Sequence, residues 1–285
     1  MCLNENEFKR NIDHHEQIFI VMPPKAGGSS LIGFARMCCG DAAVFQNQLH
    51  VPTLRKQWLT EFYDTPNLHI GHILGEGMKS LLKGVSKDSL IVYIHREETS
   101  RVASAVKHVM SVFCTGDIYF PARKAPFSFV QRNETDHTCT IEENDLVDKV
   151  IQRKVWEIKN SVHDIWSCDT FNTLNDNRPN LIVMNMNQID TLQKMLAERF
   201  FPQMANKPAL HRNVGTEKKT KNFVQLSSNS TRIVSLDEWV LKKKNMIEYT
   251  LGLKEDIGCQ NNVRDMEDKL FETCSDDGFL NFLFV

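Results

Sequence analysis

The sequence predicts an α/β protein in which a central, mostly parallel sheet is flanked by helices in three layers. Short apolar runs of strand length at residues 17–22, 89–95 and 180–186 are each followed by a segment with helical spacing. Strands that alternate with helices favour a parallel sheet covered on both faces. The composition is globular, with 41% hydrophobic and 25% charged residues. We expect one domain over residues 1–285, with an extended loop or insertion around residues 114–150.

Two capping boxes mark predicted helix starts. Thr140 with Glu143 opens a long helix to about residue 168, and Ser235 with Glu238 opens a helix to about residue 251. The other expected elements are, in chain order, a strand at 17–22, a helix at 28–39, a possible strand at 67–73, a short helix at 76–83, a strand at 89–95, a helix at 98–113, a loop over 114–140, a strand at 180–186, a helix at 190–201 and an irregular region over 202–230.

The charge balance and the apolar runs exclude several classes of protein. Thirty-four Lys and Arg residues stand against 36 Asp and Glu, a net charge of −2, whereas a dedicated nucleic-acid binder usually has a basic excess. The longest early apolar run has five residues, and a membrane span needs about 20. The first 17 residues are too polar for the core of a signal peptide. Eight cysteines without a CxxC pair favour thiols in a reducing compartment, so we expect a cytoplasmic protein. From the charge balance and the short apolar runs we expect no nucleic-acid or membrane partners. The oligomeric state stays open.

The most informative segment is PPKAGGSSL at residues 23–31, which follows the first predicted strand and opens the first predicted helix. Glycines let the backbone approach an anion closely, and the N–H groups and dipole of a helix N-terminus favour a phosphate. Ser29 and Ser30 add hydroxyl donors, and Lys25 adds a positive charge. The pattern differs from the GxxxxGK[ST] loop of nucleoside triphosphatases because the lysine precedes the glycines.

This segment resembles the 5′-phosphosulfate loop of sulfotransferases, because PKAGGSSL is close to the PKTGGTSL form of the carbohydrate and bacterial branch. A second segment supports the resemblance: Arg96, Arg101 and Ser104 have the spacing of the family's 3′-phosphate motif RDPxxRxxS, which also follows a buried strand. The family's Asp-Pro pair is replaced by two glutamates here, a change that leaves the phosphate donors in place. An arginine fork and a hydroxyl suit a phosphate dianion.

The resemblance spans about residues 17–250 and implies a P-loop-like three-layer fold. It also implies a cofactor, 3′-phosphoadenosine 5′-phosphosulfate (PAPS), which leaves as 3′,5′-adenosine bisphosphate (PAP), and no metal. The implied reaction moves the sulfuryl group to a hydroxyl or amine of an acceptor, and Lys25 stabilises the leaving oxygen. The cofactor-binding residues implied are Lys25, Ala26, Gly27, Gly28, Ser29, Ser30, Arg96 and Ser104.

A hydroxyl acceptor requires a general base near neutral pH, and histidine is the usual choice. His72, in the sequence HIGHI, resembles a Gly-His element that supplies the base in some glycan sulfotransferases. His50 is the alternative base. His69 has the wrong parity to share a strand face with His72.

We expect a small soluble acceptor, and one stretch of the sequence favours a cationic one. Residues 133–148 contain six acidic side chains and no Lys or Arg, and Glu134 and Asp136 lie outside the predicted helix start. Carboxylates at a helix start also complement the helix dipole, so the same stretch has a purely structural interpretation. Two other functions stay open: a small-molecule kinase and a non-catalytic nucleotide-binding protein.

Overall fold

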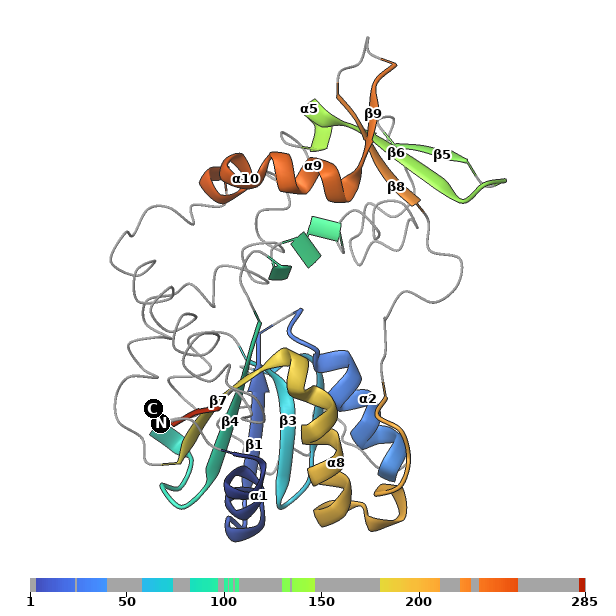
Figure 1. Ribbon diagram of the computed structural model, residues 1–285. Coiled ribbons are helices and arrows are strands. Elements are labelled where there is room, and N and C mark those ends of the chain that lie inside the picture. The colour runs from blue at the N-terminus through green and yellow to red at the C-terminus, as the bar shows by residue number, and fades with distance from the viewer. Residues whose placement is uncertain are drawn as a thin grey trace. The chain divides into compact units, whose positions relative to one another are not determined.

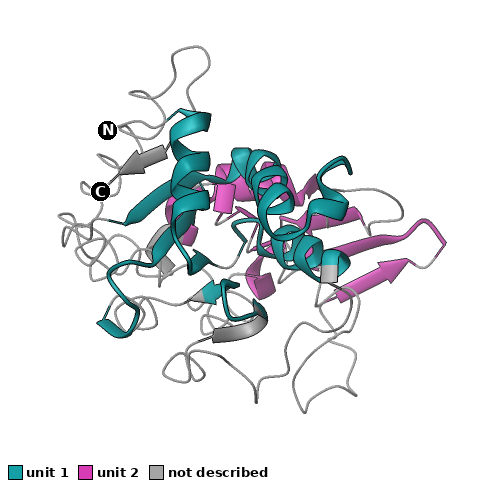
Figure 2. Cartoon of the chain, turned by 90° about the horizontal axis from the view of Figure 1, so that it is seen from below, with its two compact units in different colours: residues 1–97, 164–214, 257–285 teal, residues 98–163, 215–256 magenta. Residues whose placement is uncertain are grey.

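The computed structural model describes residues 4–23, 25–39, 58–73, 83–96, 100–101, 103–104, 106–107, 130–133, 135–146, 180–210, 221–226, 231–250 and 282–284. The chain divides into two compact units, coloured separately in Figure 2. Unit 1 comprises residues 1–97, 164–214 and 257–285, and unit 2 comprises residues 98–163 and 215–256. The segment around residues 114–150 therefore falls in unit 2. Because the chain passes between the units four times, the single domain over residues 1–285 stays a prediction.

Unit 1 is built on a six-stranded sheet in the order β10-β7-β4-β1-β3-β2 (Figure 1). Its four central strands run parallel, and β10 and β2 pair antiparallel at the two edges. Strands β1, β4 and β7 are buried at every residue, as expected of parallel strands. The predicted α/β class with a mostly parallel sheet flanked by helices is confirmed. The strands are β1 (Ile18–Met22), β2 (Trp58–Asp64), β3 (Leu68–Ile73), β4 (Leu90–His95), β7 (Leu181–Asn185) and β10 (Phe282–Phe284).

Three helices of unit 1 share one hydrophobic core with the sheet: α1 (Glu5–His14), α2 (Gly28–Cys39) and α8 (Ile189–Phe200) (Figure 1). Alternate residues of each central strand enter this core, for example Ile18, Ile20 and Met22 of β1. Each fully buried side chain of this kind stabilises the fold by about 1.5–3 kcal/mol relative to an exposed one. The expectation of a further helical layer over the other face concerns segments outside the described residues.

Unit 2 has a four-stranded sheet in the order β5-β6-β8-β9, next to α9 and α10. The side chain of Ser235 caps α9 by accepting the N–H of Glu238 at 3.2 Å, as the sequence predicted. The elements are β5 (Val130–Asn133), β6 (Thr138–Glu142), α5 (Glu143–Asp145), β8 (Lys221–Gln225), β9 (Ile233–Ser235), α9 (Leu236–Lys242) and α10 (Lys244–Thr250).

Two sequence expectations for unit 2 are wrong. The loop over 114–140 contains β5 and the start of β6, and Thr140 lies inside β6 instead of capping a helix. The irregular region over 202–230 contains a 3₁₀ turn, η5 (Pro202–Met204), in unit 1 and strand β8 in unit 2. Strands β5 and β8 have few buried residues, so they lack the apolar run that marks a buried strand, and β6 pairs with β8 at a distance that no local pattern indicates. The helices expected at 76–83 and from 147 to 168 fall almost entirely outside the described residues.

Within the described part of the chain, no helix has both the length and the apolar character needed to span a bilayer. Cys139, buried in β6, is disulfide-bonded, so the expectation of thiols throughout is wrong at this position. Disulfides are typical of oxidising compartments. The cytoplasmic location therefore stays a prediction.

Candidate functional site

The strand order of unit 1 creates a topological switch point, the place where open α/β sheets bind ligands. From β1 the chain continues to β2 and β3 on one side, and then crosses to β4 on the other side of β1. The order therefore reverses between β1 and β4, which are parallel neighbours with Val21 paired to Tyr93. Ligands in such sheets bind outside the carboxyl ends of the strands at this reversal. Both predicted phosphate motifs follow these two strands.

The turn after β1 has the backbone of a tight anion loop. Lys25 and Gly27 both adopt the left-handed region, with φ of 71° and 86°. The N–H of Ala26 donates to the carbonyl of Pro23 at 3.3 Å, and the N–H of Ser30 donates to the carbonyl of Gly27 at 3.0 Å. Helix α2 begins directly afterwards at Gly28, as predicted. The first N–H groups of a helix have no acceptor within the helix, so the N-terminus of α2 is a candidate place for an anion to bind.

The segment after β4 contacts this turn directly. The Nη1 of Arg96 donates a hydrogen bond of 2.8 Å to the main-chain carbonyl of Lys25. Both side chains are half-buried. The guanidinium thus ties the second predicted motif to the first.

His72 reaches the same place from the strand on the other side of β1. It pairs with Met22 at the carboxyl end of the parallel β1–β3 ladder. A Cβ built on Gly28 would lie 2.1 Å from the Nε2 of His72, so the imidazole tip packs against the Cα of Gly28 at the start of α2. His69 occupies the opposite face, where its ring stacks on Phe19 with centroids 4.3 Å apart. The difference in parity that the sequence indicated therefore separates the two histidines.

The turn packs against the segment that follows β7. A Cβ on Gly27 would lie 2.0 Å from the Cδ1 of Ile189 and 3.4 Å from the Cγ of Met186. Any larger residue at Gly27 must therefore displace the side chain of Ile189, besides adopting a positive φ. The sequence does not indicate this contact, because the two segments are more than 150 residues apart.

Asn185 is a further polar residue at this edge that was not predicted from the sequence. Asn185 ends β7 in register with His95 of β4, and 3% of its surface is exposed. Its Oδ1 accepts the N–H of Asn187 at 3.0 Å, while its Nδ2 is buried with no hydrogen-bond partner among the described residues. A buried amide at the end of a strand is an additional donor for the site. The only sequence signal for it is the polar residue that closes an apolar run.

The remaining predicted site residues are not brought to this edge by anything described. Ser104 is helical, half-buried and part of unit 2, as is the fully buried Arg101. The predicted acceptor residue Glu134 and the alternative base His50 lie outside the described residues.

Asp136, the second predicted acceptor residue, has a structural role in the turn between β5 and β6. Its Oδ1 accepts both the hydroxyl of Thr138 at 2.6 Å and the N–H of Thr138 at 3.0 Å. The hydroxyl bond lowers the pKa of the carboxyl below its usual value. Asp136 is exposed, so an ionised carboxylate is presented to solvent at neutral pH.

Comparison with known proteins finds no matching family model, no matching curated protein and no matching solved structure. Within the described ranges, no group of three or more His, Cys, Asp or Glu side chains has an arrangement suited to a metal ion. The function proposed below therefore depends on the geometry of the β1–β4 edge and on the resemblance of its two motifs.

Proposed function

We propose that the chain is a sulfotransferase that moves the sulfuryl group of PAPS to a hydroxyl or amine of a small soluble acceptor, on a P-loop-like fold. The observation that carries the proposal is the hydrogen bond from Arg96 to the carbonyl of Lys25. It joins two motifs that were recognised independently in the sequence. Two phosphate-binding segments at one switch point suit a ligand with two separated phosphate groups better than a simple 5′-nucleotide.

The turn over residues 25–30 supplies the donors for the 5′-phosphosulfate. The helix N-terminus and the hydroxyls of Ser29 and Ser30 suit the bound group, and the ammonium of Lys25 suits the bridging oxygen as it gains charge. Arg96 supplies further guanidinium donors for the 3′-phosphate, with Ser104 as its proposed companion. Sulfuryl transfer, like phosphoryl transfer, depends mainly on positioning and electrostatic stabilisation, so no metal is needed in this scheme.

His72 is the proposed general base for a hydroxyl acceptor. Its Nε2 lies against the start of α2, beside the proposed 5′-phosphate turn. A base must lie within hydrogen-bond reach of the proton that it removes, and in this proposal the acceptor attacks the sulfur from beside this turn, where His72 lies. The imidazole holds the proton that the acceptor hydroxyl loses while the new S–O bond forms and PAP leaves.

Calorimetry and thermal unfolding with three nucleotides test the proposal. PAP is expected to bind and to stabilise the fold, by about 2.7 kcal/mol at a concentration of 100 times its Kd. Adenosine 5′-phosphate is expected to bind more weakly, because it lacks the 3′-phosphate. ATP with magnesium is the third ligand, and stabilisation by ATP but not by PAP would establish the kinase alternative instead.

Turnover distinguishes an enzyme from a nucleotide-binding protein. The chain is incubated with PAPS and a panel of amine, phenol and sugar acceptors, and release of PAP is measured. The Lys25→Ala variant is the control, since it is expected to bind PAP but to lose transfer. Tight PAP binding without transfer to any acceptor would support the non-catalytic alternative.

A further inference from the structure

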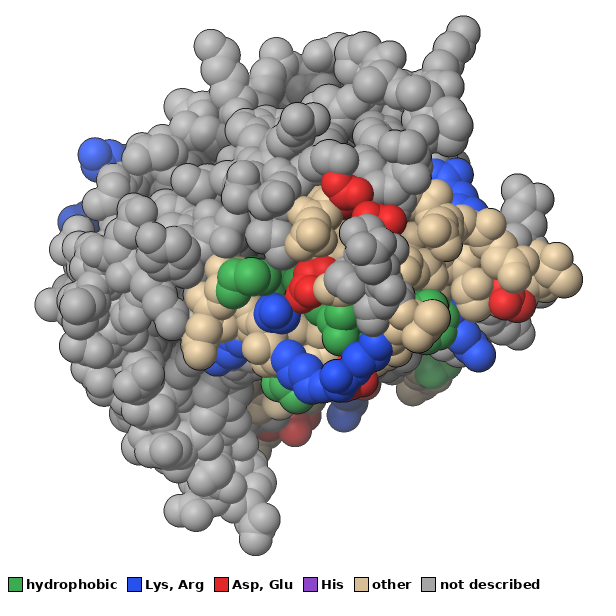
Figure 3. All heavy atoms as spheres, turned by 90° about the horizontal axis from the view of Figure 1, so that it is seen from above, with side chains coloured by type: hydrophobic (Ala, Val, Ile, Leu, Met, Phe, Trp, Pro, Cys, Tyr) green, Lys and Arg blue, Asp and Glu red, His purple; other side chains and the backbone are tan. Residues whose placement is uncertain are grey.

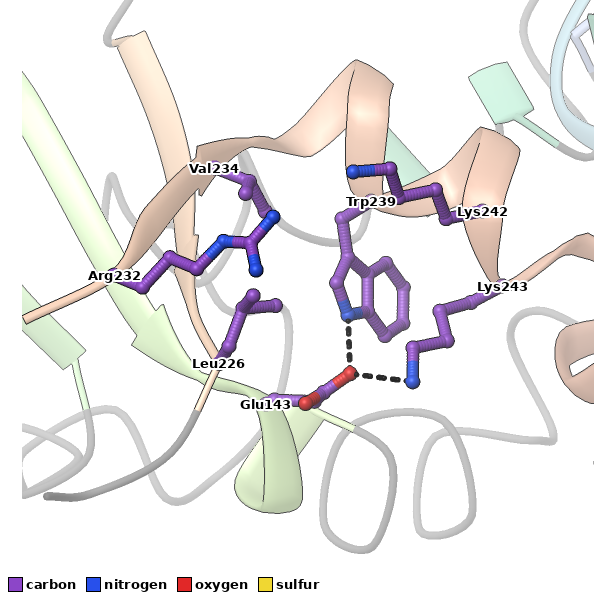
Figure 4. A pocket seen from close by; sticks show the side chains of 7 residues that line it. All are labelled: Glu143, Leu226, Arg232, Val234, Trp239, Lys242 and Lys243. Carbon is purple, nitrogen blue, oxygen red and sulfur yellow. Dashed lines mark hydrogen bonds and ion pairs between the residues drawn. The ribbon is translucent and has the colours of Figure 1, made fainter. Parts of the chain in front are cut away.

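Unit 2 contains a pocket of about 250 Å³ that none of the predicted site residues lines. The main-chain N–H of Leu226 donates to the carbonyl of Arg232 at 3.2 Å and closes the β8–β9 hairpin on one side of it. Helix α9 forms the other side, and Glu143 at the start of α5 lies between them (Figure 4). The lining residues are Glu143, Leu226, Arg232, Val234, Trp239, Lys242 and Lys243.

A network of polar contacts fixes one wall of this pocket. The Oε1 of Glu143 accepts the indole N–H of Trp239 at 3.0 Å, and the Nζ of Lys243 lies 3.0 Å from the same oxygen (Figure 4). Trp239 is 1% exposed and the side chain of Glu143 is 14% exposed. The side chain of Lys243 is 39% exposed, so the hydrogen bond between the indole of Trp239 and Glu143 is the contact that holds this wall in place before any ligand arrives.

The pocket is positively charged. Its lining includes three cations, Arg232, Lys242 and Lys243, and one carboxylate, Glu143, a balance of +2. Glu238 stands outside the lining but pairs with Lys242 and interacts electrostatically with Arg232, so the balance that includes it is +1. The guanidinium of Arg232 points into the space bounded by Leu226 and Trp239 (Figure 4). Lys and Arg side chains gather on the described surface of the face shown in Figure 3. A concave site with apolar walls strengthens the field of such charges.

We propose that this pocket binds a small organic anion, whose carboxylate, sulfonate or sulfate ester group meets Arg232 and Lys242 while an apolar ring lies against the half-buried Leu226, in a lining that the buried Val234 and Trp239 complete. Its volume is below the 300–1,000 Å³ or so of typical drug-sized pockets, which suits a single ring and excludes a nucleotide such as PAPS. The proposal does not depend on the sulfotransferase function. A purely cationic acceptor would be repelled from this pocket.

The ligand class is tested by calorimetry with matched probes. Benzenesulfonate and benzoate are expected to bind, while methyl phenyl sulfone, which replaces the charged oxygen by a methyl group, is expected to bind at least about tenfold more weakly. Inorganic sulfate tests the charge without the ring and is expected to bind more weakly than benzenesulfonate. The proposal is overturned if neither organic anion binds, if the sulfone binds as well as the sulfonate, or if benzylammonium binds better than both.

Variants locate the binding to this pocket. Arg232→Gln and Lys242→Gln remove charges from exposed side chains, so the fold is expected to remain intact, and each is expected to weaken benzenesulfonate binding about tenfold. Lys244→Gln is the matched control, because Lys244, the first residue of the next helix α10, is exposed but does not line the pocket. Lys25→Ala, in the proposed nucleotide turn, is also expected to leave this binding unchanged. Equal losses in Lys244→Gln or Lys25→Ala, or no loss in Arg232→Gln, would place the ligand elsewhere and refute the proposal.

Discussion

The guanidinium of Arg96 donates a 2.8 Å hydrogen bond to the main-chain carbonyl of Lys25, so the end of β4 supports the turn that follows β1. Arg96 therefore has two proposed tasks, to bind a 3′-phosphate and to hold the 5′-phosphosulfate turn in shape. This double role changes how a mutation at Arg96 is to be interpreted.

Arg96→Ala is expected to weaken binding of PAP strongly and binding of adenosine 5′-phosphate to a smaller extent, because the turn loses its support. Ser104→Ala is the cleaner test of the 3′-phosphate, since Ser104 belongs to unit 2 and the turn to unit 1. We expect Ser104→Ala to weaken PAP alone. Calorimetry measures the affinity of each variant for both nucleotides. Equal losses of affinity for PAP and for adenosine 5′-phosphate in Ser104→Ala would exclude a 3′-phosphate role for this hydroxyl.

The left-handed backbone of Lys25, with φ of 71°, allows its charge to be tested separately from its conformation. Lys25→Gly removes the ammonium and suits this backbone, in which a residue with a Cβ costs roughly 1–2 kcal/mol. The variant is expected to unfold at a temperature close to that of the parent while turnover falls about 10²-fold or more. The turnover of Lys25→Arg, which keeps a charge, is expected to fall less. Unchanged turnover in Lys25→Gly would remove Lys25 from the mechanism.

The contact between Gly28 and His72 predicts that two substitutions will not add. Gly28→Ala places a Cβ 2.1 Å from the Nε2 of His72, and the imidazole can rotate away at little cost because its tip is the end of a flexible side chain. We expect Gly28→Ala to stay folded but to lose much of its turnover with a hydroxyl acceptor. In a His72→Ala background the same change is expected to add little. Nucleotide binding is measured in parallel, and fully additive losses would show that the two residues act separately.

A substitution at Asp136 can test the charge of this residue separately from its role in the turn. Hydrogen bonds from Thr138 lower its pKa, so the carboxylate stabilises this turn at pH values above the unfolded pKa, and that contribution is lost as the pH falls through the lower folded pKa. Asp136→Asn keeps the acceptor oxygen and loses the charge. If the acceptor is cationic and meets this residue, Asp136→Asn is expected to raise its KM in a manner that weakens at high salt. A neutral acceptor serves as the control, and an identical change in KM for both acceptors would assign Asp136 to the turn alone.

Local signals in the sequence predicted the central strands and the helix after β1 well. Helix α2 has the bounds that the sequence indicated, and β4 differs by one residue, because a continuous apolar run and a glycine-marked helix start act over neighbouring residues. The strands of unit 2 were missed. Thr138 of β6 pairs with Lys221 of β8, a partner more than 80 residues away, and no local pattern encodes such a pairing.

For the candidate site, the sequence by itself determined which residue types stand at the ends of β1 and β4, and on that ground it predicts two anion-binding segments. It did not determine that these segments touch. The strand order β4-β1-β3 decided that Arg96 reaches the carbonyl of Lys25 from one side and that His72 meets Gly28 from the other. The packing of Ile189 on Gly27 is likewise a product of that order. The physical reason is that side chains at strand ends become neighbours only when the sheet aligns their strands, and this alignment depends on hydrogen bonds and burial summed over the whole unit.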